Sequence, residues 1–159
     1  TLGLGVRSVI EKHGISYLLD PIKDYLIADI VFGNLETVIS DVGHQAGKFD
    51  SEQLRGPSGS AFKLKEAGFN IINIANNHIM QHGLTAFKET IAELEKANIA
   101  VVGLKGNNGW TSKPIIKNFK NFKIGFLGYS SIDDNYYENT DVEYAYTNDI
   151  NKILFMFYS

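Results

Sequence analysis

The chain has 159 residues, 44% hydrophobic and 21% charged, so we expect a globular protein with a single domain over residues 1–159. A formal net charge of −3 gives no electrostatic basis for binding nucleic acid or an anionic membrane surface. The absence of cysteine excludes disulfides, zinc–thiolate sites and cysteine nucleophiles, and leaves Asp, Glu, Asn and His as metal ligands.

The chain begins with two predicted helices. Residues 5–12 predict a short helix that ends near Gly14, a residue suited to a left-handed cap. Asp20, followed by proline, predicts the start of a second helix, because Asp caps well and Pro fits the first helical position. We expect this second helix to bury Ile22 and Leu26.

A predicted strand and a polar loop come next. Residues 29–32 form a short β-rich run that breaks at Gly33-Asn34, so the residues that follow lie just past the carboxyl end of a strand. A polar loop is expected from about residue 40 to 60. A helix over 61–67 and a buried strand over 70–75 are predicted after it.

The rest of the chain predicts one more helix and several strands. The clearest amphipathic helix covers 84–97, and strands are expected at 99–102, 114–118 and 122–128, the last two as a hairpin. The apolar tail, 153–159, predicts either a buried helical turn or strand or an exposed, aggregation-prone end. No run approaches the roughly 20 apolar residues that span a bilayer. This alternation of strands and helices predicts an α/β domain.

Two polar clusters each follow a predicted buried strand. One contains Asn34 and Glu36, and the other contains Asn76, Asn77 and His78. Open α/β sheets bind ligands outside the carboxyl ends of their strands, so we expect the two clusters to meet at one edge. Carboxylate, amide oxygen and imidazole suit Mn, Fe or Zn better than Mg or Ca.

Each of these residues also has a structural interpretation. Asn34 after a strand is often a turn residue, because its side chain can mimic a backbone turn. Taken alone, Glu36 is more often a solvated surface acid, and a lone His78 is more often structural. Their joint occurrence after two strands favours a site.

Several segments resemble the bacterial capsule-synthesis family of the CapA, or poly-γ-glutamate, type, a relative of the two-metal phosphoesterases. The strongest matches are ADIVFGNLE at 28–36 and AGFNIINIANNH at 67–78. Gly83-Leu84 with Thr90 resembles the family's next helix, and the strands at 99–103 and 126–129 are similar to two of its strands. The resemblance covers about residues 2–150, with the segments in the family's order and spacing.

The resemblance implies a metallophosphoesterase-like fold, a sandwich of mixed sheets flanked by helices, truncated here at both ends. It implies a metal ligand at Glu36 with Asn34 beside it, and a second ligand at Asn77 through its amide oxygen. His78 would be the catalytic residue, facing the substrate oxyanion or protonating the leaving group. Such sites hold two divalent metal ions, here Mn, Fe or Zn, that activate a bridging water.

Arg55 and Asn76 are the expected substrate-binding residues. The guanidinium of Arg55 suits a phosphate or carboxylate, although a solvated loop arginine is an equally good interpretation. His82 is close enough in sequence to reach the site, but a structural or solvent role is favoured. His44 lies in the polar loop, and His13 lies near a helix end where a cation complements the dipole.

The chain departs from the family pattern at three places. The family's first strand ends in Gly-Asp and its last motif contains a metal-binding His, and this chain shows neither. Gln81 also stands where the family usually has Asp. We therefore expect incomplete metal binding and weak turnover.

Two functions are implied by the resemblance. The first is a metal-dependent, phosphoesterase-like hydrolase for poly-γ-glutamate capsule biosynthesis, acting on a phosphate ester or a capsule polymer intermediate. The second is a non-catalytic subunit of a membrane capsule-synthesis or export complex. The family also implies a membrane-associated, extracytoplasmic location, and no nucleic-acid partner is expected.

Overall fold

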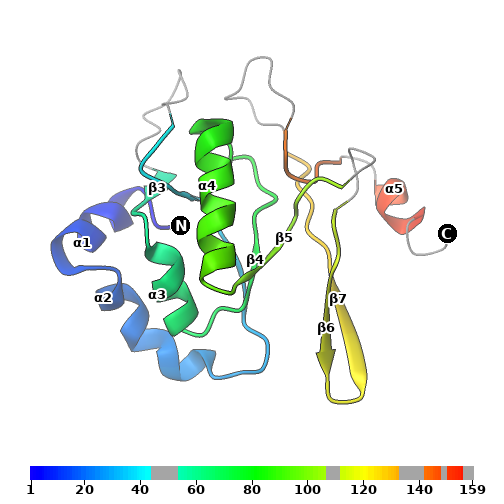
Figure 1. The fold of residues 1–159 in the computed structure, drawn as a ribbon, viewed down its shortest axis with the longest axis horizontal. Helices are drawn as coiled ribbons and strands as arrows, with labels where there is room; N and C mark the ends of the chain where they lie inside the picture. Colours follow the sequence, from blue (N-terminus) through cyan, green and yellow to red (C-terminus); the bar gives the residue numbers. More distant parts are fainter. Residues whose placement is uncertain (44–53, 107–111, 133–141, 148–149, 156–159) are drawn as a thin grey trace.

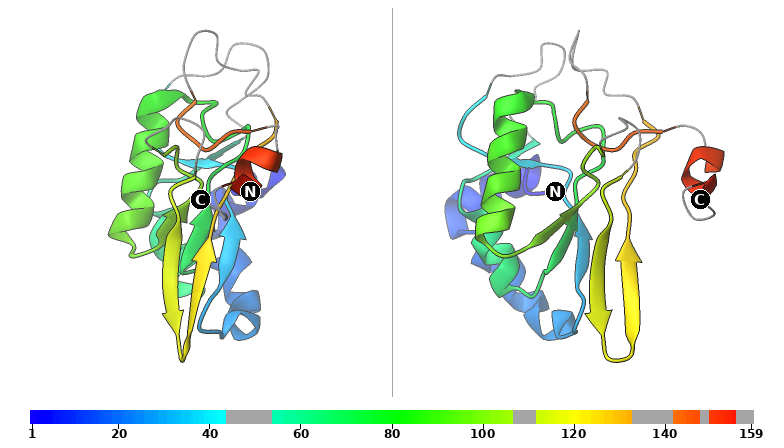
Figure 2. Two further views of the ribbon diagram at one scale, coloured as in Figure 1. Left: turned by 90° about the vertical axis from the view of Figure 1, so that its right-hand side faces the viewer. Right: turned by 45° about the vertical axis from the view of Figure 1, so that its right-hand side comes forward.

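A parallel sheet with helices on one side and a β-hairpin on the other forms the body of the protein (Figures 1 and 2). The computed structural model describes residues 1–43, 54–106, 112–132, 142–147 and 150–155. The predicted α/β class is confirmed.

The first helix matches its prediction. Helix α1 spans Gly5–His13 and ends at Gly14, which has a φ of 78° and donates its N–H to the Ile10 carbonyl at 2.7 Å. A positive φ costs glycine little, which explains why the helix stops there. A short helix α2, Ser16–Leu19, follows.

The second predicted helix forms as a 3₁₀ helix. It is η1, Asp20–Leu26, with proline in its first turn. The predicted burial of Ile22 is wrong, because its side chain is 40% exposed, while Leu26 is partly buried against the core. A 3₁₀ helix has about three residues per turn, so residues four apart do not share a face as they do in an α-helix.

The central sheet has the strand order β1-β4-β5, and both pairings are parallel. Its strands are β1 Phe32–Asn34, β4 Ile71–Asn73 and β5 Ala100–Val102. In the register, Asn34 lies opposite Asn73.

Strand β1 begins later than the predicted run, 29–32, and it includes Asn34. The side chain of Asn70 accepts a hydrogen bond from Val31 N at 3.0 Å and donates one to Asp29 O at 2.9 Å. The start of the predicted run is therefore bonded to an amide side chain, and its first backbone hydrogen bonds to the neighbouring strand segment are those that Val31 O accepts from Asn70 N and Ile71 N.

Two smaller sheets complete the strands. Strands β2, Val38–Ile39, and β3, Arg55–Gly56, pair in parallel, so the prediction of a polar loop throughout 40–60 is wrong at β3. Residues 44–53 of that loop lie outside the described residues. The predicted hairpin is confirmed as β6, Ile115–Phe119, and β7, Phe122–Phe126.

The hairpin contacts the central sheet through aromatic rings. Phe126 of β7 stacks on Phe32 of β1, with ring centroids 6.0 Å apart and planes at 13°. Aromatic pairs of this kind contribute about 0.5–1.5 kcal/mol beyond the area that they bury. The stack joins the hairpin to the edge of the sheet that carries the first polar cluster.

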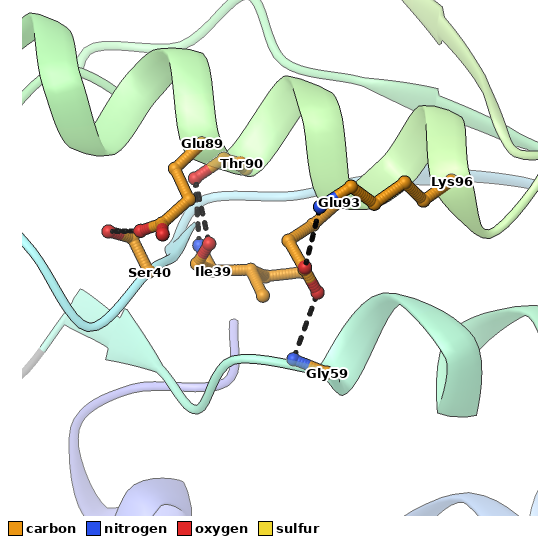
Figure 3. A network of polar contacts seen from close by, with 7 residues as sticks. All are labelled: Ile39, Ser40, Gly59, Glu89, Thr90, Glu93 and Lys96. Carbon is orange, nitrogen blue, oxygen red and sulfur yellow. Dashed lines mark hydrogen bonds and ion pairs between the residues drawn. The ribbon is translucent and has the colours of Figure 1, made fainter.

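Helix α4, Gly83–Lys96, is attached to its neighbours by polar contacts along one face (Figure 3). The hydroxyl of Thr90, which is fully buried, accepts a hydrogen bond from Ile39 N at 2.9 Å. The carboxylate of Glu93 accepts one from Gly59 N at 2.9 Å. The first contact fixes β2, which follows the first polar cluster, against the helix, and the second fixes the residue that precedes α3.

The main core lies between the helices and the central sheet. Helix α3, Ser60–Glu66, buries Ala61 and Leu64 there, and α4 buries Phe87 and Leu94. Close to the end of the described chain, helix α5 spans Ile150–Phe155, with Leu154 47% exposed. None of the helices in the described ranges is long and apolar enough to cross a membrane.

Candidate functional site

The two polar clusters meet at the carboxyl ends of β1 and β4. Leu35 N donates to Asn73 O at 2.9 Å, which extends the pairing of the two strands by one residue. The buried side chain of Asn76 then donates from Nδ2 to Leu35 O at 2.9 Å. The loop that carries Glu36 is therefore bonded directly to the loop that carries Asn77 and His78.

Three asparagine side chains, Asn34, Asn73 and Asn76, form an amide cluster at this edge. Asn34 Oδ1 accepts hydrogen bonds from Asn73 Nδ2 at 2.8 Å and from Asn76 Nδ2 at 3.5 Å. Backbone partners fix the donors: Asn73 Oδ1 accepts from Ala75 N at 3.2 Å, and Asn76 Oδ1 accepts from His78 N at 3.1 Å. The contact with Asn73 is the strong one, and the contact with Asn76 lies at the outer limit of a hydrogen bond.

Asn73 was missed by the sequence analysis. It is the last residue of β4 and lies opposite Asn34, the last residue of β1. Asn34 follows the first predicted strand, 29–32, and Asn73 lies inside the second, 70–75, but only the observed strand ends and the register show that the two side chains meet.

Two glycines close around Asn73. Gly103 has a φ of 97°, and a Cβ on it would lie 2.7 Å from both Ala75 N and Asn73 Oδ1. A Cβ on Gly128 would overlap the Asn73 side-chain oxygen. The loops after β5 and β7 therefore approach the amide cluster so closely that neither position accommodates a side chain.

His78 is half-buried and held from several directions. Its Nδ1 lies 2.7 Å from Gln81 Nε2, and its carbonyl accepts a hydrogen bond from Gln81 N at 3.2 Å. Its Nε2 lies 3.5 Å from Asn77 Nδ2, at the outer limit of a hydrogen bond. The ring thus has a fixed position beside the amide cluster, and Gln81 is its closest polar partner among the contacts described.

Glu36 and Asn77 are both half-buried and directly follow the bonded pair Leu35 and Asn76. No hydrogen bond joins the Glu36 carboxylate to another described residue. Within the described ranges, no group of three or more His, Asp or Glu side chains is placed to hold a metal ion. Glu36 and Asn77 thus lie next to each other's loops without a surrounding cluster of acidic or imidazole side chains among the described residues.

Arg55, in β3, is half-buried, and its guanidinium makes its contacts within the protein. Its Nη1 donates to Ser40 O at 3.0 Å and to Val42 O at 2.6 Å, and its Nη2 lies 2.9 Å from His82 Nδ1. A guanidinium only donates, so Nδ1 of His82 is the acceptor. His82 is fully buried just before α4, and Arg55 therefore connects the segment after β2 to the start of this helix.

Two histidines remain. His13 lies in the last turn of α1 and stacks on Tyr17, with ring centroids 4.7 Å apart. His44 lies outside the described residues.

Comparison with known proteins gives the family. The capsule biosynthesis protein CapA of Bacillus anthracis is 26% identical over 132 residues, which cover 81% of this chain and 32% of that protein. The PGA biosynthesis protein CapA of Bacillus subtilis is 30% identical over 103 residues, which cover 64% of this chain and 27% of that protein. The uncharacterized protein y4sH of Sinorhizobium fredii is 34% identical over 109 residues, or 62% of this chain and 22% of that protein.

The chain thus spans about a third or less of the length of these relatives. The family model described as bacterial capsule synthesis protein PGA_cap matches residues 1–153, almost the whole chain. The protein belongs to the PGA_cap family of bacterial capsule synthesis proteins.

Proposed function

We propose that the whole protein is a metal-dependent, phosphoesterase-like hydrolase that serves poly-γ-glutamate capsule biosynthesis and has a metallophosphoesterase-like sandwich fold. The substrate is a phosphate ester or a capsule polymer intermediate. The observation that carries the proposal is the hydrogen bond from Asn76 Nδ2 to Leu35 O at 2.9 Å, which joins the two polar clusters at one sheet edge. The names of the Bacillus relatives support the capsule part of the proposal.

The proposed metal ligands are Glu36 through its carboxylate and Asn77 through its amide oxygen. Their donor types suit Mn, Fe or Zn, but the described residues form only part of a ligand set, so other residues of the whole protein complete it. Two such ions, when bound, would acidify a bridging water for attack on phosphorus. Asn34 was a candidate ligand, but its two accepted hydrogen bonds favour a role in positioning the loops.

His78 is the proposed catalytic residue. Its ring is half-buried beside Asn77, and in this proposal it donates a hydrogen bond to a phosphoryl oxygen or to the leaving group. A positioned donor or acid of this kind contributes roughly 10²–10⁴-fold to the rate. Substrate binding by Arg55 and Asn76 stays a prediction, and their contacts within the protein favour positioning roles.

The test is hydrolysis of p-nitrophenyl phosphate by the full-length protein supplied with Mn, Fe or Zn. We expect His78→Ala to lower kcat by roughly 10²–10⁴-fold and Glu36→Ala to lower the bound metal measured by mass spectrometry. His13→Ala, on α1, is the matched control and should leave both unchanged. Full activity in His78→Ala would remove this residue from the mechanism.

A non-catalytic subunit of a membrane capsule-synthesis complex is the second candidate. It is favoured by the finding that fewer than three acidic or imidazole ligands gather in the described ranges. A full-length protein that hydrolyses no ester with any divalent metal, yet restores polymer formation in a deficient host, would establish this function instead.

A further inference from the structure

The contact between the side chains of Gln81 and His78 bears on which nitrogen of the His78 ring carries its proton. Gln81 Nε2 lies 2.7 Å from His78 Nδ1, well within hydrogen-bond distance. The Gln81 side chain is buried, with only 2% exposed, so its amide has few alternative positions. The turn from His78 to Gln81, closed by the backbone hydrogen bond of 3.2 Å, holds the two side chains together.

An amide NH₂ group only donates, so the atom that it faces must accept. In this arrangement Nδ1 of His78 carries no proton, and the proton of a neutral ring lies on Nε2. The other amide nitrogen near the ring, Asn77 Nδ2, lies 3.5 Å from Nε2, so the 2.7 Å contact with Gln81 is the stronger of the two and decides the tautomer. The orientation leaves Gln81 Oε1 buried without a hydrogen-bond partner among the described residues. An unsatisfied carbonyl is more common in native proteins than an unsatisfied N–H donor, which favours this orientation over the flipped one.

We propose that Gln81 is a positioning residue that holds the neutral His78 ring with its proton on Nε2, directed away from Gln81. The catalytic meaning of this inference depends on the proposed function, whereas the tautomer does not. A neutral ring with Nε2–H donates a hydrogen bond to a negatively charged phosphoryl oxygen without giving up its proton. Gln81 therefore favours charge stabilisation by His78 over transfer of a proton to the leaving group.

The position of the other amides agrees with this role. Asn76 Oδ1 binds the backbone N–H of His78 at 3.1 Å, so backbone and ring are held by separate buried side chains. The side chain of Gln81 contacts the ring, whereas only its backbone N–H contacts the His78 carbonyl. A change at Gln81 should therefore alter the tautomer without displacing the loop.

The test is ¹⁵N NMR of the full chain with labelled histidine, at a pH where the rings are neutral. The chain has four histidines, and loss of one set of signals in His78→Gln assigns the ring. In the wild type we expect the proton on Nε2 and a hydrogen-bonded acceptor at Nδ1. In Gln81→Glu, which has the same shape, the carboxylate accepts from Nδ1–H, and the proton should move to Nδ1.

Gln81→Met removes the contact at a similar volume and should abolish the hydrogen-bond shift of Nδ1. It keeps the test informative if the buried charge of Gln81→Glu prevents folding. Asn118→Asp, an exposed amide-to-carboxylate change on β6, is the matched control and should leave the His78 ring unchanged. A proton on Nδ1 in the wild type, or a ring that responds to neither change at Gln81, would overturn the inference.

Activity separates this inference from the proposed function. With the ester substrate, Gln81→Met should lose about 10–100-fold in kcat, as outer partners of site residues commonly do. If the wild type has no turnover but shows Nε2–H with the expected response to Gln81→Glu, the hydrolase proposal fails and the positioning role stands. If turnover is present but the tautomer is the opposite one, only the role of Gln81 fails.

Discussion

Asparagine side chains lie at both ends of strand β4, and they do different things there. At the amino end, Asn70 makes two hydrogen bonds, to Val31 N and Asp29 O, and both partners are backbone groups of the neighbouring segment. At the carboxyl end, Asn73 and Asn76 both donate hydrogen bonds to the side chain of Asn34. Asn76 also accepts a hydrogen bond from the backbone N–H of His78.

The two ends of β4 also differ in their surroundings. A cavity of about 220 Å³ lies at the amino end, lined by Asp29, Ile30, Asn70, Lys117, Asn118 and Phe119. The amide of Asn70 is already used by the backbone, so it holds the strand in place. At the carboxyl end, Asn76 instead holds the backbone N–H of His78, whose side chain is half-buried. One residue type therefore holds a neighbouring strand at one end of β4 and joins the two polar loops at the other.

Gly103→Ala should destabilise the carboxyl end of β4 more strongly than the loss of an amide side chain there. The new methyl group would meet Ala75 N and Asn73 Oδ1 at 2.7 Å, and alanine would be strained at a φ of 97°. Strain and overpacking together should lower the free energy of unfolding by about 2–5 kcal/mol, measured by urea denaturation. Gly125→Ala, where a Cβ meets nothing within 4 Å, is the control and should change stability by less than about 0.5 kcal/mol.

Asn76→Ala tests whether an amide at the carboxyl end of β4 both stabilises the fold and positions His78. It leaves Leu35 O and His78 N without their side-chain partner, which should cost about 1–3 kcal/mol. The ¹⁵N signals of the His78 ring should also change, and hydrolysis by the full-length protein should fall. Unchanged ring signals in a destabilised protein would show that Asn76 holds the fold and not the imidazole.

Asn70→Ala is the matching change at the amino end. Losing two hydrogen bonds to backbone groups at a half-buried position should cost about 1–2 kcal/mol in denaturant unfolding. The His78 ring signals and the hydrolytic rate should stay as in the wild type. An effect on the ring as large as that of Asn76→Ala would remove the distinction between the two ends.

The smallest effect is expected for Lys23→Met, on the helix side of the protein. The ammonium of Lys23 lies 2.6 Å from the Asp20 carboxylate, and this hydrogen bond raises the pKa of Lys23 above its ordinary value of 10.5. A raised lysine pKa stabilises the folded state below the unfolded pKa, and this contribution is lost as pH rises through the folded pKa. Because the pair is exposed and screened, thermal melts of the variant and wild type should agree closely at neutral pH.

Elements with strong local patterns were predicted well from sequence. Helix α4 and the β6–β7 hairpin depend on periodicity and turn residues that the chain shows locally. The meeting of the two polar loops also followed from a simple rule, that neighbouring parallel strands end at the same edge, and the bond from Asn76 to Leu35 agrees with it.

What the sequence could not show depends on long-range contacts. Nothing local indicates that Arg55 reaches His82, or that Val38 pairs with Arg55 in a two-residue strand. The helix at Ile22 was expected from its start signals, but its 3₁₀ geometry, which exposes that residue, was not. These features arise when distant segments pack, and short patterns do not encode them.

The hydrogen bonds that assemble the site join residues far apart in the chain. Asn34 to Asn73, Leu35 to Asn76 and Asn34 to Asn76 are separated by 39, 41 and 42 positions. No locally folded fragment can make these contacts. The site therefore forms only when the chain segment between β1 and β4 folds back and the two strands pair. The amide proton of Leu35, bonded to Asn73 O, belongs to the same cooperative unit, and its exchange with solvent reports how often the whole site comes apart.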